Sequence, residues 1–570
     1  MLALLLTALM FSRGLSMDSR GTSFTTAFPE NIAFYFPKTY NLLKITVLFN
    51  DTAVNITSLA NGNSTTKSGV SNGTILTLNL TKDVEEYRFV PSNKSFRITS
   101  NKNITVLSVS GWEGRFQSHV VEPDQNLGTV YQVPLLNIQF TNNQFQAPAT
   151  LLFNLRLMII NAADKDNTVT IKKVDPSGQS LEDKVTLGPL SLIQIKTNVS
   201  VKEINAEFNV SVILTHPCLD GINCSCNMVR SQLKPQSSGD QIATFPVPPI
   251  FNITQIQVTT KRPFRVAQGV YSVQNSITVY NSTDILPLFS NNLNQNFLIS
   301  TSVPVTLHLI SPGLILDIMS TSMFSGCFLV DFNSTQSGAL VIANTSSTSG
   351  VQINDQPLAS NVMWRILNGT GFSWAMVEAQ QIGTIWHQTD KIGVYMIERL
   401  DIWTIYGSPA ITLGMTPDRS GCLLNSENFV LGDDKMSWSL SREYCMETAD
   451  ELATLNTLDN QNKLSLYLAQ EEVTDGWISL RRSLYSTNWY WKSEDHSPPN
   501  VTFTYWAYGQ PEKPEKGLCA SISLDTPTKF MWKSARCCSE NKPVCFNRPK
   551  YFSFNKTVHQ MLNGSSEESA

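Results

Sequence analysis

The spacing of cysteines and tryptophans between Cys422 and Cys545 restricts the fold more than any other feature of this chain. Six of the ten cysteines lie in this stretch. Two sets of residues recur there at helical spacing: Trp438, Ser441, Cys445 and Ala449, and then Leu464, Tyr467 and Leu468. They predict two amphipathic helices, with Asp459 as the candidate cap of the second. Aromatic clusters after Trp477, broken by prolines and glycines, predict strands joined by one long loop.

The same stretch carries an ordered series of short motifs. They are Trp438-Ser-Leu-Ser-Arg-Glu-Tyr-Cys445, Leu452-Ala-Thr-Leu455, Trp477-Ile-Ser-Leu480, Trp491, Trp506, Gln510-Pro511-Glu512, Cys519-Ala-Ser-Ile522, Trp532 and Pro543-Val-Cys545. In this order and spacing they resemble the C-type lectin domain, which implies an α+β domain over residues 420–547. The resemblance also implies that Cys445 pairs with Cys545, and that Cys519 pairs with Cys537 or Cys538. By parity, Cys422 would join the leftover member of that adjacent pair, and the choice between the two stays open.

The long loop is where this fold usually binds its ligand. In sugar-binding relatives a Q-P-D or E-P-N triplet, a nearby acid and an N-D dipeptide after a tryptophan supply oxygen ligands for calcium. Here Lys533 and Ser534 follow the tryptophan, and a lysine supplies no ligand and adds positive charge. We therefore expect no calcium and no other cofactor. The candidate ligand-binding residues are Gln510, Glu512 and Glu515, with Trp506 and Tyr508 as aromatic stacking surfaces.

Residues 17–415 alternate short apolar runs with Asn, Gly, Ser and Pro, which predicts an all-β region. A faint repeat opens with Gly21-Thr-Ser-Phe24, Gly128-Thr-Val-Tyr131 and Ala243-Thr-Phe245. Its spacing of roughly 100 residues suits one β-sandwich-like unit per repeat better than a solenoid. We expect units near 21–127, 128–240 and 241–415, with a shorter fourth unit ending at Gly393-Val-Tyr395.

Three more motifs lie near the two ends of this region: Phe28-Pro29-Glu30-Asn31, Gly393-Val-Tyr395 and Tyr406-Gly-Ser-Pro-Ala410. Together they resemble the N-terminal domain of IgG Fc-binding protein over most of residues 21–415. That family is associated with secreted mucus proteins, and we expect extracellular recognition in mucus or innate immunity. No short motif marks an Fc-binding site.

The apolar run Leu2–Phe11 predicts a cleaved signal peptide over residues 1–16 and hence a secreted, extracellular product. The alternative is an N-terminal core strand, because no Lys or Arg precedes the run. No later segment is long and apolar enough to predict a membrane span. A net charge of −4 gives no broad basic face for nucleic acid.

Sequons for N-glycosylation recur along the chain and predict a glycoprotein with a polar, glycosylated tail at 548–570. The candidates are Asn50, Asn55, Asn63, Asn72, Asn79, Asn93, Asn103, Asn198, Asn209, Asn252, Asn281, Asn333, Asn344, Asn368, Asn500, Asn555 and Asn563. Sequons on predicted strands, such as Asn79 and Asn209, fall on the outward phase of the alternation.

Catalysis has little support, because the six histidines are scattered and no nucleophile or metal-ligand motif is present. The cysteines outside the lectin-like stretch are Cys218, Cys224, Cys226 and Cys327. Their even number and the oxidising compartment favour two disulfides over a metal site. We therefore expect a non-enzymatic binding protein for an extracellular glycan or glycoprotein. The alternative is a structural component of mucus or extracellular matrix, in which the lectin-like domain is only a folding module.

Overall fold

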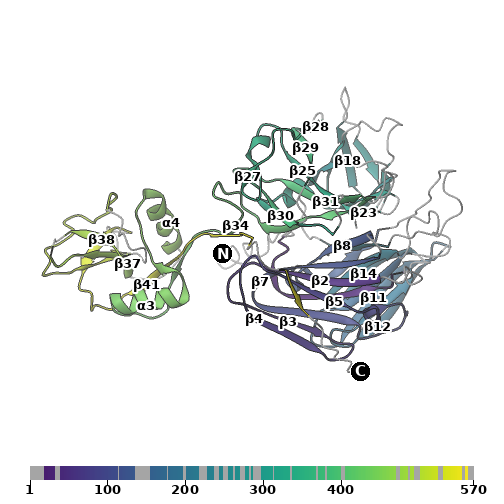
Figure 1. Cartoon of the computed structure of the whole chain (residues 1–570), viewed down its shortest axis with the longest axis horizontal. Coiled ribbons are helices and arrows are strands. Elements are labelled where there is room, and N and C mark those ends of the chain that lie inside the picture. The colour runs from purple at the N-terminus through teal and green to yellow at the C-terminus, as the bar shows by residue number, and fades with distance from the viewer. Residues whose placement is uncertain are drawn as a thin grey trace. The chain divides into compact units, whose positions relative to one another are not determined.

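The computed structural model describes residues 18–31, 39–112, 115–134, 155–175, 177–196, 200–216, 228–236, 243–247, 255–260, 264–269, 277–280, 284–286, 297–311, 314–333, 337–367, 370–378, 382–399, 405–469, 475–485, 488–492, 501–523, 530–554 and 559–562. The predicted signal peptide, Cys218, Cys224, Cys226 and seven sequons lie outside these ranges: Asn198, Asn252, Asn281, Asn368, Asn500, Asn555 and Asn563. The chain divides into two compact units (Figure 1). Unit 1 comprises Met1–Leu424 and Phe552–Ala570, and unit 2 comprises Asn425–Tyr551.

The first β module of unit 1 is a nine-stranded sheet, ordered β4-β3-β7-β2-β5-β43 with β1, β6 and β8 beside this path. Its strands are β1 (Gly21–Pro29), β2 (Thr39–Val47), β3 (Thr52–Ser58), β4 (Ser64–Val70), β5 (Ile75–Leu80), β6 (Glu85–Glu86), β7 (Ser95–Trp112), β8 (Arg115–Val121) and β43 (His559–Leu562). The long strand β7 pairs with β1 and β3 through its first half and with β2 and β8 through its second. Alternating apolar residues of these strands, Ile45, Ile98 and Val106 among them, form the core of the module.

Strand β43 comes from the far end of the chain and completes the first sheet. It runs parallel to β5, with His559 opposite Ile75 and Leu562 opposite Leu78. In Figure 1 it is the yellow strand among the purple ones. Phe552 is also buried in unit 1, and its backbone N donates a 2.9 Å hydrogen bond to the carbonyl of Cys422. The segment predicted as a polar tail (548–570) therefore contains structured parts, because aromatic residues at its start supply buried apolar surface.

The second β module is a seven-stranded sheet, ordered β12-β11-β14-β10-β13 with β9 and β15 paired to β14. Its strands are β9 (Gly128–Gln132), β10 (Arg156–Asn161), β11 (Asn167–Val174), β12 (Ser180–Leu187), β13 (Leu192–Lys196), β14 (Ser200–His216) and β15 (Val229–Gln232). The first strands of both modules start at a glycine packed on a proline. A Cβ on Gly21 would lie 2.4 Å from Pro123 Cβ, and one on Gly128 would lie 2.5 Å from Pro235 Cβ. This shared contact gives the faint sequence repeat a steric basis.

The third predicted unit (241–415) contains two modules of two sheets each. The third module has sheets β16-β21-β18-β19 and β20-β17-β22-β23, made of β16 (Ala243–Val247), β17 (Gln255–Thr259), β18 (Phe264–Gly269), β19 (Ile277–Tyr280), β20 (Asp284–Leu286), β21 (Phe297–Thr301), β22 (Thr306–Ser311) and β23 (Leu314–Asp317). The fourth has sheets β27-β26-β30-β24-β33 and β28-β29-β25-β31-β32. Its strands are β24 (Cys327–Asp331), β25 (Ser337–Asn344), β26 (Val351–Ile353), β27 (Gln356–Pro357), β28 (Arg365–Leu367), β29 (Phe372–Glu378), β30 (Ile382–His387), β31 (Gly393–Arg399), β32 (Ile405–Pro409) and β33 (Ile411–Gly414).

Unit 2 combines two helices with a seven-stranded sheet, ordered β35-β41-β37-β39-β40 with β36 and β38 attached. Its elements are β34 (Leu423–Asn425, which starts in unit 1), β35 (Asn428–Leu431), α3 (Trp438–Thr448), β36 (Glu451–Leu452), α4 (Leu458–Leu468), β37 (Asp475–Arg482), β38 (Trp489–Trp491), β39 (Cys519–Ser523), β40 (Trp532–Ala535), β41 (Lys542–Asn547) and β42 (Lys550–Tyr551). The predicted fold, a mainly β region followed by an α+β domain, is confirmed. The predicted cap of the second helix is wrong: Thr457 is the N-cap, accepting from Asn460 N at 3.1 Å, and Asp459 lies in the first turn.

Disulfides differ from the sequence prediction at Cys422. Cys445 is bonded to Cys545, as the lectin resemblance implies, and Cys519 takes Cys537 of the two open partners. Cys422 pairs with Cys327 of the fourth module, however, and Cys538 is an exposed free thiol. The expectation that Cys327 pairs with Cys218, Cys224 or Cys226 is therefore wrong. An even number of cysteines in each region did not identify the partners.

None of the described sequon asparagines is fully buried. Asn50, Asn63, Asn79, Asn93, Asn209 and Asn344 are exposed, and Asn55, Asn72, Asn103 and Asn333 are partly buried. At Asn333 the Nδ2 atom, to which a glycan would attach, is itself buried. In the described part of the chain, no helix is long and apolar enough to cross a bilayer.

Candidate functional site

The loop between β38 and β39 is tied to β40 through the side chain of Gln510. Its Oε1 accepts hydrogen bonds from the backbone N and from the Oγ of Ser534, each at 2.9 Å. The same hydroxyl accepts a 3.0 Å hydrogen bond from Glu512 N. The Gln510–Pro511 peptide is cis. The side-chain carbonyl of Gln510, the first of the predicted ligand-binding groups, is thus occupied by donors of the protein itself.

Lys533 is the other residue that follows the tryptophan of β40, and it forms an ion pair. Its Nζ lies 2.6 Å from Asp475 Oδ1 at the start of β37. Both side chains are partly exposed, so the pair is a modest contribution to stability. The Lys533 ammonium thus already neutralises the Asp475 carboxylate.

Glu512 and Glu515, the two predicted acidic ligands, are both exposed. Glu512 Oε1 lies 3.5 Å from Gln510 Nε2, and the carbonyl of Glu512 accepts a 2.9 Å hydrogen bond from Arg482 Nη1. Within the described residues, no three His, Cys, Asp or Glu side chains stand close enough to hold a metal ion. The loop carboxylates therefore face solvent, where they can accept hydrogen bonds from hydroxyl groups of a ligand.

The two predicted stacking residues have different environments. Trp506 is half-buried, with its ring centroid 4.8 Å from that of Trp489 and 5.6 Å from that of Trp532. It is a packing residue of the loop base. Tyr508 is fully exposed, and so is Tyr485 in the turn between β37 and β38. Sequence reasoning missed Tyr485, although an aromatic residue in a polar turn was a usable signal.

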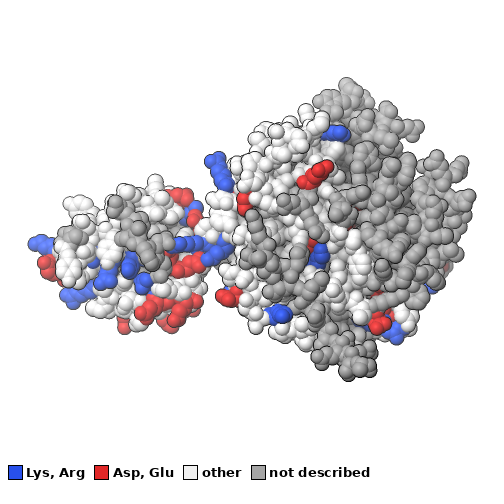
Figure 2. All heavy atoms as spheres, in the orientation of Figure 1, with Lys and Arg blue, Asp and Glu red and all other residues white. Residues whose placement is uncertain are grey.

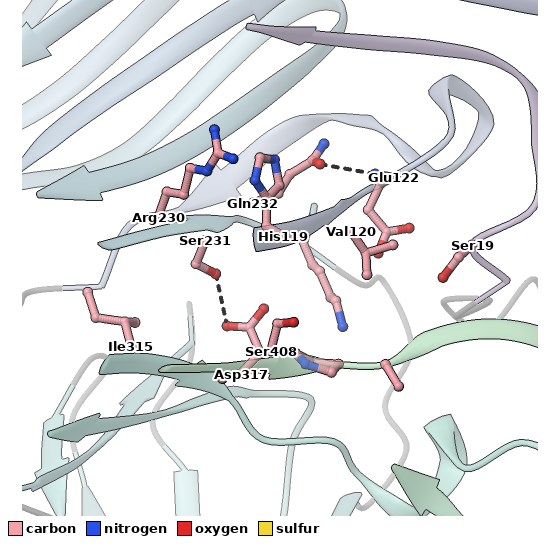
Figure 3. Close-up of a pocket in the computed structure, with 14 residues that line it drawn as sticks. Ser19, His119, Val120, Glu122, Arg230, Ser231, Gln232, Ile315, Asp317 and Ser408 are labelled. Carbon is pink, nitrogen blue, oxygen red and sulfur yellow. Dashed lines mark hydrogen bonds between the residues drawn. The ribbon is translucent and has the colours of Figure 1, made fainter. Parts of the chain in front are cut away.

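A second polar site lies inside unit 1, between β8 and β15 on one side and β23 and β32 on the other (Figure 3). Asp317 Oδ1 lies 3.0 Å from His308 Nε2 and 3.4 Å from Ser231 Oγ. Burial lowers the pKa of His119, and the neighbouring Arg230 lowers it further. The cavity measures about 50 Å³, well below the roughly 300 Å³ of small ligand pockets. These groups belong to the packing of the β modules, with room for a few water-sized species.

Comparisons with known proteins match both parts of the chain. The lectin C-type domain family model matches residues 434–547. Residues 434–547 are a C-type lectin domain. C-type lectin domain family 6 member A of Rattus norvegicus is 28% identical over 134 residues, which are 23% of this chain and 58% of that protein. The solved structure of human lithostathine covers 22% of this chain and 93% of its own, with 20% identity and a TM-score of 0.20.

A second match covers a larger share of the chain. IgGFc-binding protein of Homo sapiens is 25% identical in an alignment of 401 residues that covers 64% of this chain. That alignment takes in 7% of the human protein, so this chain spans a small part of its length.

A calcium-independent type II antifreeze protein is similar in structure to 22% of this chain and 88% of its own, at 18% identity and a TM-score of 0.19. The two predicted resemblances are confirmed.

Proposed function

We propose that this chain is a secreted, non-enzymatic recognition protein whose C-type lectin domain binds an extracellular glycan or glycoprotein without the usual calcium site. The C-type lectin domain itself supports recognition of a glycan or protein as its role. The disulfides Cys327–Cys422, Cys445–Cys545 and Cys519–Cys537 support an oxidising, extracellular compartment.

The observation that carries calcium independence is the double hydrogen bond from Ser534 to Gln510 Oε1. A calcium ion needs six to eight oxygen ligands. Binding it here would break two hydrogen bonds and would bring the ion toward the ammonium of Lys533, which already pairs with Asp475. Both terms oppose the ion.

The surface left for a ligand is the exposed part of the loop. Tyr508 and Tyr485 present whole aromatic faces to solvent, and such faces stack on the apolar face of a sugar ring. Glu512 and Glu515 add exposed acceptors. Because Trp506 is packed against its neighbours, we assign it to holding the loop rather than to contacting the ligand.

A glycan and glycoprotein array, probed with the full secreted chain in calcium and in chelator, tests this function. We expect the same ligands in both conditions. The variant Tyr485→Ala/Tyr508→Ala should lose most of the binding, since it removes both exposed aromatic faces. Leu466→Ala, an exposed position on α4, is the matched control and should bind like the wild type. Binding that disappears with chelator, or self-association with no ligand at all, would defeat the proposal, and the latter would favour the structural alternative.

A further inference from the structure

Basic residues of β37, of the position after β40 and of the preceding loop lie at one end of the unit 2 sheet. Arg481 on β37 is opposite Cys519 on β39, and Cys519 is in turn opposite Ala535 on β40. Arg482 and Arg536 directly follow the outer two members of this row. Two of the arginines are thus consecutive on β37, and the third follows β40, which is separated from β37 by β39 in the same sheet.

The loop brings two lysines to the same end. A Cβ on Gly517 would lie 2.4 Å from the backbone carbonyl of Ala535, so the loop backbone touches the end of β40. Lys516 directly precedes this contact and Arg536 directly follows it. Lys513 is joined to Lys516 by a 2.9 Å turn hydrogen bond. We call Arg481, Arg482, Lys513, Lys516 and Arg536 the basic cluster.

Two arginines of the cluster are held against tryptophans. The Cζ of Arg481 lies 5.5 Å from the ring centroid of Trp438, and that of Arg482 lies 5.5 Å from the ring centroid of Trp489. Arg482 is fixed further by the hydrogen bond from its Nη1 to Glu512 O, 2.9 Å long. The Nε of Arg481 is buried and has no hydrogen-bond partner. Stacking restricts these guanidinium groups before any ligand arrives, which lowers the entropy cost of binding.

The cluster lies in a unit that is acidic as a whole. Residues 425–551 contain 14 Lys and Arg against 17 Asp and Glu, a net charge of −3. Elsewhere in the described part of unit 2, Lys463, Lys533, Arg548 and Lys550 each pair with a carboxylate. Arg481, Lys513, Lys516 and Arg536 form no ion pair in the described part of this unit, and neither do Lys435, Lys492 and Lys542. On the face of this unit seen in Figure 2, Lys and Arg side chains form a band, with Asp and Glu side chains below it and at its ends.

We infer that the C-type lectin domain binds acidic glycans, with the basic cluster holding sulfate or carboxylate groups while Tyr485 and Tyr508 contact the sugar rings. The inference rests on the proposed function and names its ligand class. Arginine forks match the geometry of sulfate and carboxylate oxygens, and exposed lysines add charge. The exposed tyrosines and loop carboxylates of the same domain favour a sugar over a nucleic acid or a lipid surface, because they offer ring stacking and accept hydrogen bonds from hydroxyl groups.

The test measures binding of the full chain to chondroitin sulfate, hyaluronan and dextran, which present sulfate plus carboxylate, carboxylate alone and no charge. We expect chondroitin sulfate to bind most tightly, dextran least, and affinity to fall as salt is raised from 0.05 to about 0.3 M, since exposed charge pairs are screened. The variant Lys513→Gln/Lys516→Gln/Arg536→Gln should weaken binding about tenfold. Its control, Lys67→Gln/Lys102→Gln/Lys391→Gln, changes the net charge equally at exposed positions of unit 1 and should bind like the wild type.

Each outcome has a defined meaning. Binding of hyaluronan and chondroitin sulfate alike supports carboxylate as sufficient, and binding of chondroitin sulfate alone supports sulfate. Equal binding of dextran overturns the acidic ligand but leaves the proposed glycan recognition intact. Failure of both acidic glycans, or an equal loss of affinity in the control variant, overturns the inference. Equally tight binding of anionic vesicles or single-stranded DNA, lost in the same variant, overturns the assignment to glycans. Unchanged thermal midpoints show that each variant is folded.

Discussion

Glu398 on β31 shows how the packing of the β modules perturbs a single side chain. The carboxyl is buried near Asp331, which forms a 2.8 Å ion pair with Lys44 of the first module. Two buried carboxyl groups thus face one ammonium. Burial, reinforced by Asp331, raises the pKa of Glu398 to about 7, while the backbone N–H of Asn333 and the charge of Lys44 act in the opposite direction.

This pKa predicts how stability depends on pH. An unfolded glutamate titrates near 4.5, so between about pH 4.5 and about pH 7 the folded chain holds a proton that the unfolded chain releases. The free energy of unfolding therefore falls as pH rises through this window, by up to about 3 kcal/mol, and is then constant with respect to this group. In chemical denaturation followed from pH 4 to 8, Glu398→Gln should remove the fall. An identical slope in the variant would show that other groups cause it.

Gly128 is a second residue with a measurable steric role. A methyl group there would lie 2.5 Å from Pro235 Cβ, and overpacking of this kind costs about 1–3 kcal/mol. We predict that Gly128→Ala lowers the thermal midpoint of unfolding. Gly188→Ala is the control, because its nearest neighbour would be 3.7 Å away, and it should change the midpoint little. Equal effects of the two substitutions would argue against the glycine–proline contact.

At the scale of elements, the periodicity of the sequence predicted helices and strands, but it did not predict which side chain caps a helix. The helical spacing of Trp438 and Cys445 predicted α3, and both residues are buried on its inner face. Strand alternation placed the sequon at Asn79 outward, and it is exposed. The cap of α4 was missed because Thr457 and Asp459 are both capping residue types, and only geometry shows whose oxygen reaches Asn460 N. The exposure of Tyr485 likewise depends on a turn conformation that no periodic pattern encodes.

The Cys327–Cys422 disulfide differs from the pairing of Cys422 with Cys537 or Cys538 that the even cysteine count predicted. It joins β24 to the segment just before unit 2 and closes a loop of 95 residues. In the chain-entropy model a loop of this length is worth about 4 to 5 kcal/mol. We predict that Cys327→Ala/Cys422→Ala lowers the stability of unit 1 by up to this amount, as measured by chemical denaturation. Peptide mapping without reduction should recover the Cys327–Cys422 pair, and a peptide joining Cys422 to Cys538 would refute the pairing.

For the whole molecule, unit 2 is an insertion into unit 1 along the chain. The chain leaves unit 1 at Leu424 and returns at Phe552, after which β43 completes the first sheet. Sequence analysis placed the lectin domain but missed this return, because a four-residue strand at the end of a polar segment gives no periodic signal. The C-type lectin domain and the β modules are thus separate compact units of one chain.

Calcium-independent recognition is the central claim for that smaller unit, and the variant Lys533→Asn/Ser534→Asp provides its positive control. It removes the ammonium beside Asp475 and replaces the hydroxyl that occupies Gln510 Oε1 with a carboxylate. We expect this variant to bind calcium more tightly than the wild type, since both changes favour a divalent cation.

The most direct measurement is calorimetric titration of calcium into the full wild-type chain, followed by titration of mannose and galactose with and without chelator. We predict no calcium binding in the micromolar range and no sugar binding that chelator reverses, because the donors of Ser534 and the charge of Lys533 oppose the ion. Micromolar calcium binding, together with mannose or galactose binding that chelator abolishes, would contradict this conclusion.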